Sequence, residues 1–157
     1  MIGRALAASP RPAPIRPDAE DNARVRAFCA LFEAEFGKMP ATTSLRRSHA
    51  DIPMSGDKAQ RAAAIVSGVI EHRETLDTMI GELADRLPLD QIALVDQTVL
   101  RIALFEMLFD NGAVRPNTAV RHAVTLAKRF GDDGSRRFVT GVLGTVTRNR
   151  LQAGTAE

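Results

Sequence analysis

Apolar residues recur along this chain at spacings of three and four, and no useful stretch alternates with a period of two. The first apolar stripe begins at Asp21 or Asn22 and stops at Gly37, a residue that commonly ends helices. Its apolar members are Val25, Phe28, Cys29, Phe32 and Phe36. The pattern predicts a first helix that buries this face.

A second apolar stripe starts near Asp57 and runs to Leu83, and its phase slips between His72 and Thr75. The slip predicts a bend or a division into two helices. Residues 38–56 contain two prolines and no sustained period, so we expect a long loop between the first two helical regions.

The most apolar segment follows Pro88 and Asp90. Between residues 99 and 108 its apolar side chains nearly encircle the helix axis, which is typical of a central helix. Arg101 and Glu106 are the charged exceptions, and we interpret each as a snorkelling or paired charge rather than a reactive group.

Two more helices are predicted near the end of the chain. One is capped by Asn117 and ends at Gly131, and the other starts at the cap Ser135 and frays after Arg150. Because strand patterns are missing, the sequence predicts an all-α, compact bundle of six or seven helices.

The domain organisation follows from the distribution of these stripes. Residues 1–17 contain four prolines and little that could pack, so we expect a disordered arm over residues 1–20. A single helical domain is expected over residues 21–150, followed by a flexible tail over 151–157. A domain of this size can bury a sizeable core.

Composition excludes several classes of protein. The single cysteine, Cys29, cannot form an intramolecular disulfide, and its place in the first stripe favours a buried thiol over a nucleophile. The three histidines lack metal-ligand spacing, so we expect no metal site and no cofactor. We see neither a signal peptide nor a membrane span, and therefore expect a cytoplasmic protein.

Charge is distributed unevenly along the chain. Residues 1–17 carry a net charge of +3, residues 18–110 carry −6, and residues 111–157 carry +5. The asymmetry suggests a basic surface for an anionic partner and an acidic surface for a basic protein. Segregated solvated faces without a partner are the alternative.

The stretch "FGDDGSRRFVTGVLG" raises the clearest question about function. Arg136 and Arg137 in the first turn of a helix oppose its macrodipole, at a cost of roughly 0.3–1 kcal/mol each. With the free backbone N–H groups they would form a phosphate site, unless Asp132 and Asp133 simply neutralise them. Phe138 is either part of the core or a stacking platform for a base.

Three stretches together resemble the NusB family of bacterial transcription antitermination factors over residues 21–147. They are "ARVRAFCALFEAE", "LPLDQIALVDQTVLRIALFEML" and "AVTLAKRFGDDGSRRFVTGVLG". The central family pattern is matched by Asp96, Val99, Leu100, Arg101, Ile102, Ala103, Phe105 and Glu106. The closing pattern is matched by Ala127, Lys128, Phe130, Gly131, Ser135, Phe138, Val139, Gly141, Val142 and Leu143.

The resemblance implies a helical bundle that binds single-stranded boxA RNA of ribosomal leader transcripts and catalyses no reaction. It also implies a complex with NusE, a small-subunit ribosomal protein, which helps RNA polymerase to read through terminators. The implied RNA-binding residues are Arg24, Arg26, Ser135, Arg136, Arg137 and Phe138. The implied NusE-facing residues are Phe32 and Asp96, while monomer and homodimer both stay open.

The chain also departs from the family pattern. Acidic residues precede Arg24 where an arginine run is usual, and Arg121 and His122 replace the usual Asn-Glu pair. If that Glu normally pairs with the central arginine, Arg101 needs another partner, for which we expect Glu106. An alternative function is therefore a NusB-like protein scaffold that has lost specific RNA binding.

Overall fold

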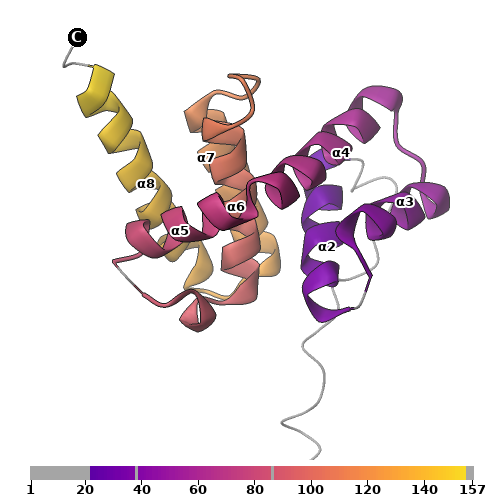
Figure 1. Cartoon of the computed structure of the whole chain (residues 1–157), viewed down its shortest axis with the longest axis horizontal. Coiled ribbons are helices and arrows are strands. Elements are labelled where there is room, and N and C mark those ends of the chain that lie inside the picture. The colour runs from indigo at the N-terminus through magenta and orange to yellow at the C-terminus, as the bar shows by residue number, and fades with distance from the viewer. Residues whose placement is uncertain (1–21, 38, 86, 155–157) are drawn as a thin grey trace, which may run out of the picture.

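The computed structural model describes residues 22–37, 39–85 and 87–154, with side chains to residue 149. This part of the chain forms seven α-helices and one 3-10 turn, and it contains no strand, which confirms the all-α prediction (Figure 1). The elements are α2 (Ala23–Phe36), α3 (Ala41–Asp51), α4 (Gly56–Glu71), α5 (Arg73–Leu83), η2 (Leu89–Gln91), α6 (Leu94–Leu108), α7 (Pro116–Phe130) and α8 (Ser135–Gly154). The predicted arm over residues 1–20 lies outside the described residues.

Several predicted helix ends are confirmed. The Asn22 side chain accepts a hydrogen bond from the Arg24 backbone N–H at 2.8 Å and so caps α2, which ends at Gly37. His72 separates α4 from α5, at the point where the apolar phase slips. The phase of the apolar stripes therefore predicted the break as well as the helices.

Three boundary predictions were wrong or incomplete. Helix α3 occupies much of the expected loop, because a polar helix held by its neighbours has no apolar stripe to reveal it. Helix α7 starts at Pro116, since proline suits the first helical position, and Arg115 rather than Asn117 precedes it. Helix α8 continues beyond the predicted end at residue 150, as far as Gly154.

Helix α6 is the centre of the fold, as its apolar surface predicted. Every residue from Asp96 to Met107 is buried. Helices α2, α3 and α4 pack together at one side of α6, whereas α7 and α8 pack at the other (Figure 1). Side chains far apart in the sequence can therefore meet around this helix.

Helix α4 crosses close to α6 at Gly68. A Cβ atom at this position would lie 2.1 Å from the Phe105 ring, so the close packing requires glycine. Among the described residues, no helix is both long enough and apolar enough to span a membrane.

Candidate nucleic-acid and partner surfaces

The turn between α7 and α8 is built around Asp132. Its Oδ1 accepts hydrogen bonds from the backbone N–H groups of Gly134 at 2.9 Å and Ser135 at 3.1 Å. The Ser135 hydroxyl in turn accepts a bond from the Asp132 backbone N–H at 3.1 Å and donates to Asp132 Oδ1. Asp132, rather than the expected Ser135, therefore supplies the main side-chain cap of α8.

Ser135 is only 1% exposed, so its side chain supports the turn instead of presenting a surface. A Cβ atom at Gly131 would lie 2.3 Å from the Ser135 hydroxyl oxygen. The glycine that ends α7 is therefore required for the Ser135 side chain to reach back to Asp132.

Arg136 and Arg137 are exposed in the first turn of α8. Neither guanidinium forms an ion pair with any residue that the structure describes. Asp132 directs its carboxylate at backbone N–H groups, so it does not neutralise them through a salt bridge. Both cationic side chains are thus available to an anionic partner.

Phe138 is half-buried and packs against the hydrophobic core, one turn after these arginines. The structure therefore supports the packing interpretation for most of its ring. Gly141 is exposed, and nothing lies within 4 Å of the position that its Cβ would occupy. The backbone of α8 is consequently open to solvent beside the side chain of Arg137, one turn earlier.

Other exposed basic side chains occur on α7, on α8 and just before α7. They are Arg115, Arg121, Lys128 and Arg148. Together with Arg136 and Arg137 we call them the α7–α8 basic residues. Their distribution agrees with the net charge of +5 calculated for residues 111–157.

Arg24 occupies a different environment from the arginines of α8. Its Nε and Nη2 each donate to a carboxylate oxygen of Glu106 at 2.9 Å. Arg61 donates to Glu106 Oε2 at 2.7 Å, and it also forms an ion pair with Asp110. Since the Glu106 side chain is 1% exposed, this cluster joins α2 and α4 to the inside of α6.

Arg26 is itself only 1% exposed. Its Nη1 donates to the Ser48 carbonyl at 3.0 Å and to the Ser48 hydroxyl at 2.7 Å, while Nη2 donates to the Ile52 carbonyl at 2.7 Å. These acceptors lie at the C-terminal end of α3, where carbonyl groups favour a cation. Arg26 therefore fixes α3 against α2 and is not on the surface in this conformation.

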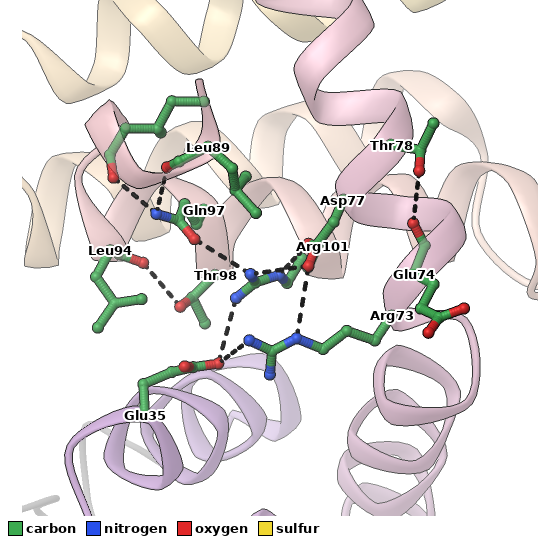
Figure 2. Close-up of polar contacts among 11 residues, drawn as sticks. Glu35, Arg73, Glu74, Asp77, Thr78, Leu89, Leu94, Gln97, Thr98 and Arg101 are labelled. Carbon is green, nitrogen blue, oxygen red and sulfur yellow. Dashed lines mark hydrogen bonds and ion pairs between the residues drawn. The ribbon is translucent and has the colours of Figure 1, made fainter. Parts of the chain in front are cut away.

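Arg101 is the centre of a third cluster, which Figure 2 shows. Its Nε donates to Asp77 Oδ1 at 2.7 Å and its Nη2 donates to Gln97 Oε1 at 3.1 Å. Glu35 accepts from Nη1 at 3.4 Å and also pairs with Arg73. The expected Arg101–Glu106 pair was wrong, because each residue meets partners from other helices.

The two predicted partner-facing residues are largely covered. Phe32 is 7% exposed, with its ring stacked on Phe28 and in edge contact with Phe36. Phe36 is 56% exposed and is the accessible aromatic side chain of this row. Sequence reasoning placed it on the buried stripe, although its position beside Gly37 at the helix end was a signal of exposure.

Asp96 is 7% exposed in the first turn of α6. Burial raises the pKa of its carboxyl, the neighbouring Ser135 hydroxyl lowers it, and the charge of Asp132 raises it. Asp96 therefore lies beside the turn that starts α8, and its Oδ1 is buried without a hydrogen-bond partner among the described residues.

His122, on α7, lies near the cluster of Arg24 and Glu106. Burial lowers the pKa of this histidine, Arg24 lowers it further and Glu106 opposes the shift. The imidazole is therefore neutral at pH 7, so His122 adds no formal positive charge there.

Comparison with known proteins shows which family the chain belongs to. A sequence profile described as the NusB family matches residues 21–148, which is most of the chain. The chain belongs to the NusB family. This result confirms the resemblance carried by its central and closing motifs.

NusB relatives match along most of their own length. The transcription antitermination protein NusB of Chloroflexus aggregans is 45% identical over 129 residues, covering 82% of this chain and 86% of that protein. The NusB protein of Roseiflexus castenholzii is 41% identical, covering 78% of this chain and 89% of its own. The family is one of transcription antitermination factors and is not a known enzyme family.

Solved structures agree with the sequence relatives. A structure of NusB from T. maritima has a TM-score of 0.74 and 26% identity, and it covers 80% of this chain and 88% of the solved one. A structure of antitermination factors NusB and NusE in complex with dsRNA has a TM-score of 0.73. At 22% identity, covering 82% of this chain and 96% of that one, the second comparison supports the NusB fold.

Proposed function

We propose that this transcription antitermination factor binds the boxA element of ribosomal RNA leader transcripts together with NusE. The bound complex helps RNA polymerase to read through terminators. The observation that carries the proposal is the pair of exposed arginines, Arg136 and Arg137, at the start of α8 without an ion-pair partner among the described residues. A related solved structure of NusB and NusE in complex with dsRNA supports this class of partners.

The proposed RNA surface begins at the first turn of α8. Two exposed guanidinium groups lie there beside each other in the sequence and can bind phosphate, whereas the backbone N–H groups of Gly134 and Ser135 already donate to Asp132. Phe138 offers the exposed part of its ring in the same turn of the helix, and the other exposed basic residues of α7 and α8 would attract the RNA backbone. In this proposal Ser135 and Asp96 support the surface from beneath.

Arg24 and Arg26 receive an indirect role in the same proposal. Arg24 holds Glu106 in a bidentate pair, and Arg26 is buried against α3. We therefore assign them to the support of the helical bundle rather than to the first contacts with RNA.

The proposed NusE surface lies on the acidic part of the chain, around the row of Phe32 and Phe36. Phe36 provides exposed apolar area, whereas the buried Phe32 supports it from behind. Glu33 is exposed on the same helix and would complement a basic ribosomal protein. In this proposal Asp96 affects the binding of NusE indirectly, because it helps to fix the position of α6.

The proposal is tested by fluorescence anisotropy with a boxA RNA and its scrambled control, with and without NusE. Each titration is repeated at two salt concentrations. Replacing Arg136 and Arg137 by Ala should weaken boxA binding and reduce the single-strand salt slope by about 0.7 for each lost phosphate contact.

The matched control is the Arg46→Ala/Arg47→Ala variant, which removes two exposed arginines that are consecutive in the sequence of α3. We expect this control to retain boxA selectivity and most of the salt slope. Equal loss in both variants would indicate general electrostatic attraction and contradict a site at α8.

The alternative is a protein scaffold that binds NusE without specific RNA recognition. Acidic Asp18, Glu20 and Asp21 precede α2, and the first two helix arginines are engaged inside the molecule. Binding to NusE with equal affinity for boxA and scrambled RNA would favour this function. Selective boxA binding, strengthened by NusE, would exclude it.

A further inference from the structure

Helices α3 and α4 enclose an open pocket of about 310 Å³, which the proposed RNA and NusE surfaces do not use. Its wall is mostly apolar and includes Leu45 from α3, Met54 from the connecting segment, and Ala63 and Val66 from α4. Arg46 and His49 lie at the same pocket. An apolar pocket with a few polar groups is typical of a binding site.

The pocket lies beside the point where the chain enters α2. Ala23, the first residue of α2, packs in a small buried cluster with Met54 and Ala62. Leu45 and Ala59, which both line the pocket, pack against the same cluster. The start of α2 therefore lies next to the pocket.

The segment before α2 has a suitable composition for an extended ligand. Residues 10–17 read "PRPAPIRP", with four prolines and a single large apolar side chain, Ile15. Proline fixes φ, so such a segment loses less conformational entropy when it binds. At about 3.1 Å per residue in the polyproline conformation, Ile15 reaches roughly 20 Å from Asn22.

Charge complementarity favours the same occupant. Asp18, Glu20 and Asp21 lie between Ile15 and α2 in the sequence. Arg46 is exposed there, and its hydrogen bond to Thr43 Oγ1 is long at 3.5 Å. A basic side chain beside the pocket therefore matches the acidic residues of the connecting segment.

We propose that the α3–α4 pocket binds the chain's own segment 10–17, with the Ile15 side chain inserted between the two helices. Binding in cis brings Arg16 close to the start of α2, where acidic residues otherwise dominate the sequence. Neither RNA nor NusE is required for this contact. Its test is therefore independent of the antitermination proposal.

The contact can be measured by paramagnetic relaxation in the full chain. A Ser9→Cys variant carries a nitroxide label, and Cys29 resists labelling because burial raises its pKa to about 12. We expect the label to reduce the amide signals of Thr42, Ala63 and Ser67 at least twofold. The signal of Thr145 on α8 serves as the reference.

Three variants separate specific docking from proximity. Ile15→Asp should restore the pocket signals, whereas the matched Ile2→Asp variant should leave them reduced. Ala63→Glu, at an exposed position of α4, should also restore them by placing a charge in the apolar pocket. Circular dichroism checks that each variant retains its helical content.

A mixed sample distinguishes binding in cis from binding between molecules. Labelled chains without ¹⁵N are combined with unlabelled ¹⁵N chains, and docking in cis predicts no reduction of the ¹⁵N signals. Reduction of the pocket signals in this mixture would assign the pocket to the arm of a second copy and overturn the proposal. The proposal would also be overturned if the label did not reduce the pocket signals, or if Ile15→Asp did not restore them.

Discussion

The arginines of α2 and those of α8 have the same chemistry and opposite environments. On α2, Arg24 is paired with the buried Glu106 and Arg26 is buried against the end of α3. On α8, Arg136 and Arg137 are exposed and form no ion pair within the part of the chain described. The first pair holds helices together, whereas the second is available for binding.

The difference has an energetic reason. Breaking a buried ion pair by removing one partner costs about 3–5 kcal/mol, because a charge is left without compensation inside the protein. An exposed arginine contributes little to stability, and near a helix N-terminus it is slightly unfavourable. Stability therefore accounts for the arginines of α2 and leaves those of α8 to be explained by function.

The largest effect is expected from Glu106→Ala, because Glu106 is buried and shared by Arg24 and Arg61. We expect a loss of about 3 kcal/mol or more in the free energy of unfolding, measured by denaturant titration. Glu82→Ala, at an exposed position of α5, is the control and should change stability by less than about 0.5 kcal/mol. If Glu106→Ala lowered the free energy of unfolding by less than about 1 kcal/mol, the ion pair of Arg24 would not distinguish the arginines of α2 from those of α8.

Arg26→Met should have the next largest effect. It removes the hydrogen bonds that Ser48 and Ile52 accept at the end of α3, at an expected cost of about 2–3 kcal/mol. The rate of amide hydrogen exchange should increase more in α3 than in α7. Arg47→Met, an exposed replacement on α3, should leave both quantities nearly unchanged, and equal effects would mean that Arg26 has no special role.

A smaller effect is expected in the pH dependence, through His122. Burial and Arg24 lower the folded-state pKa below the ordinary value of 6.5, so the unfolded chain takes up this proton first as the pH falls. The contribution of neutral His122 is complete above pH 6.5 and is lost as the pH falls through the folded-state pKa.

His122→Gln should therefore flatten the stability profile below pH 6.5, as measured by denaturant titrations at several pH values. His49→Gln, on α3, provides a histidine control outside this cluster. A profile that keeps its slope in the His122 variant would show that this histidine is not coupled to the Arg24 cluster.

The smallest change in stability is expected for Arg136→Ala with Arg137→Ala. Removing two cations from the first turn of α8 should leave the free energy of unfolding unchanged or raise it by about 0.5 kcal/mol. Thermal unfolding measures this directly. A clear loss of stability would give these residues a structural role and weaken their assignment to RNA binding.

The apolar pattern predicted the parts of the fold whose stripes face a core. It gave the limits of α2, the break at His72 and the central position of α6, since each depends on local spacing. It missed α3, whose residues are mainly polar and whose position depends on bonds from Arg26. A helix whose position depends on bonds from another helix has few features in its own sequence that predict it.

The candidate site divides in the same way. The exposed pair Arg136 and Arg137 was identified from an unfavourable charge beside a helix start, which is a local feature. The burial of Ser135 and Asp96, and the pairing of Arg101 with Asp77, could not be predicted in this way. Their partners come from separate helices.

By itself, the sequence determined the all-α class, the helix phases, the uneven charge and the motifs of the family. Only the tertiary structure decided which arginines are internal and which are free to bind. The arginines of α2 and α8 are the same residue type in the sequence. Their environments differ because they are set by residues far along the chain, such as Glu106, which lies 82 positions from Arg24. Periodicity is a property of neighbours along the chain, whereas the partner of a charge is chosen by packing between helices.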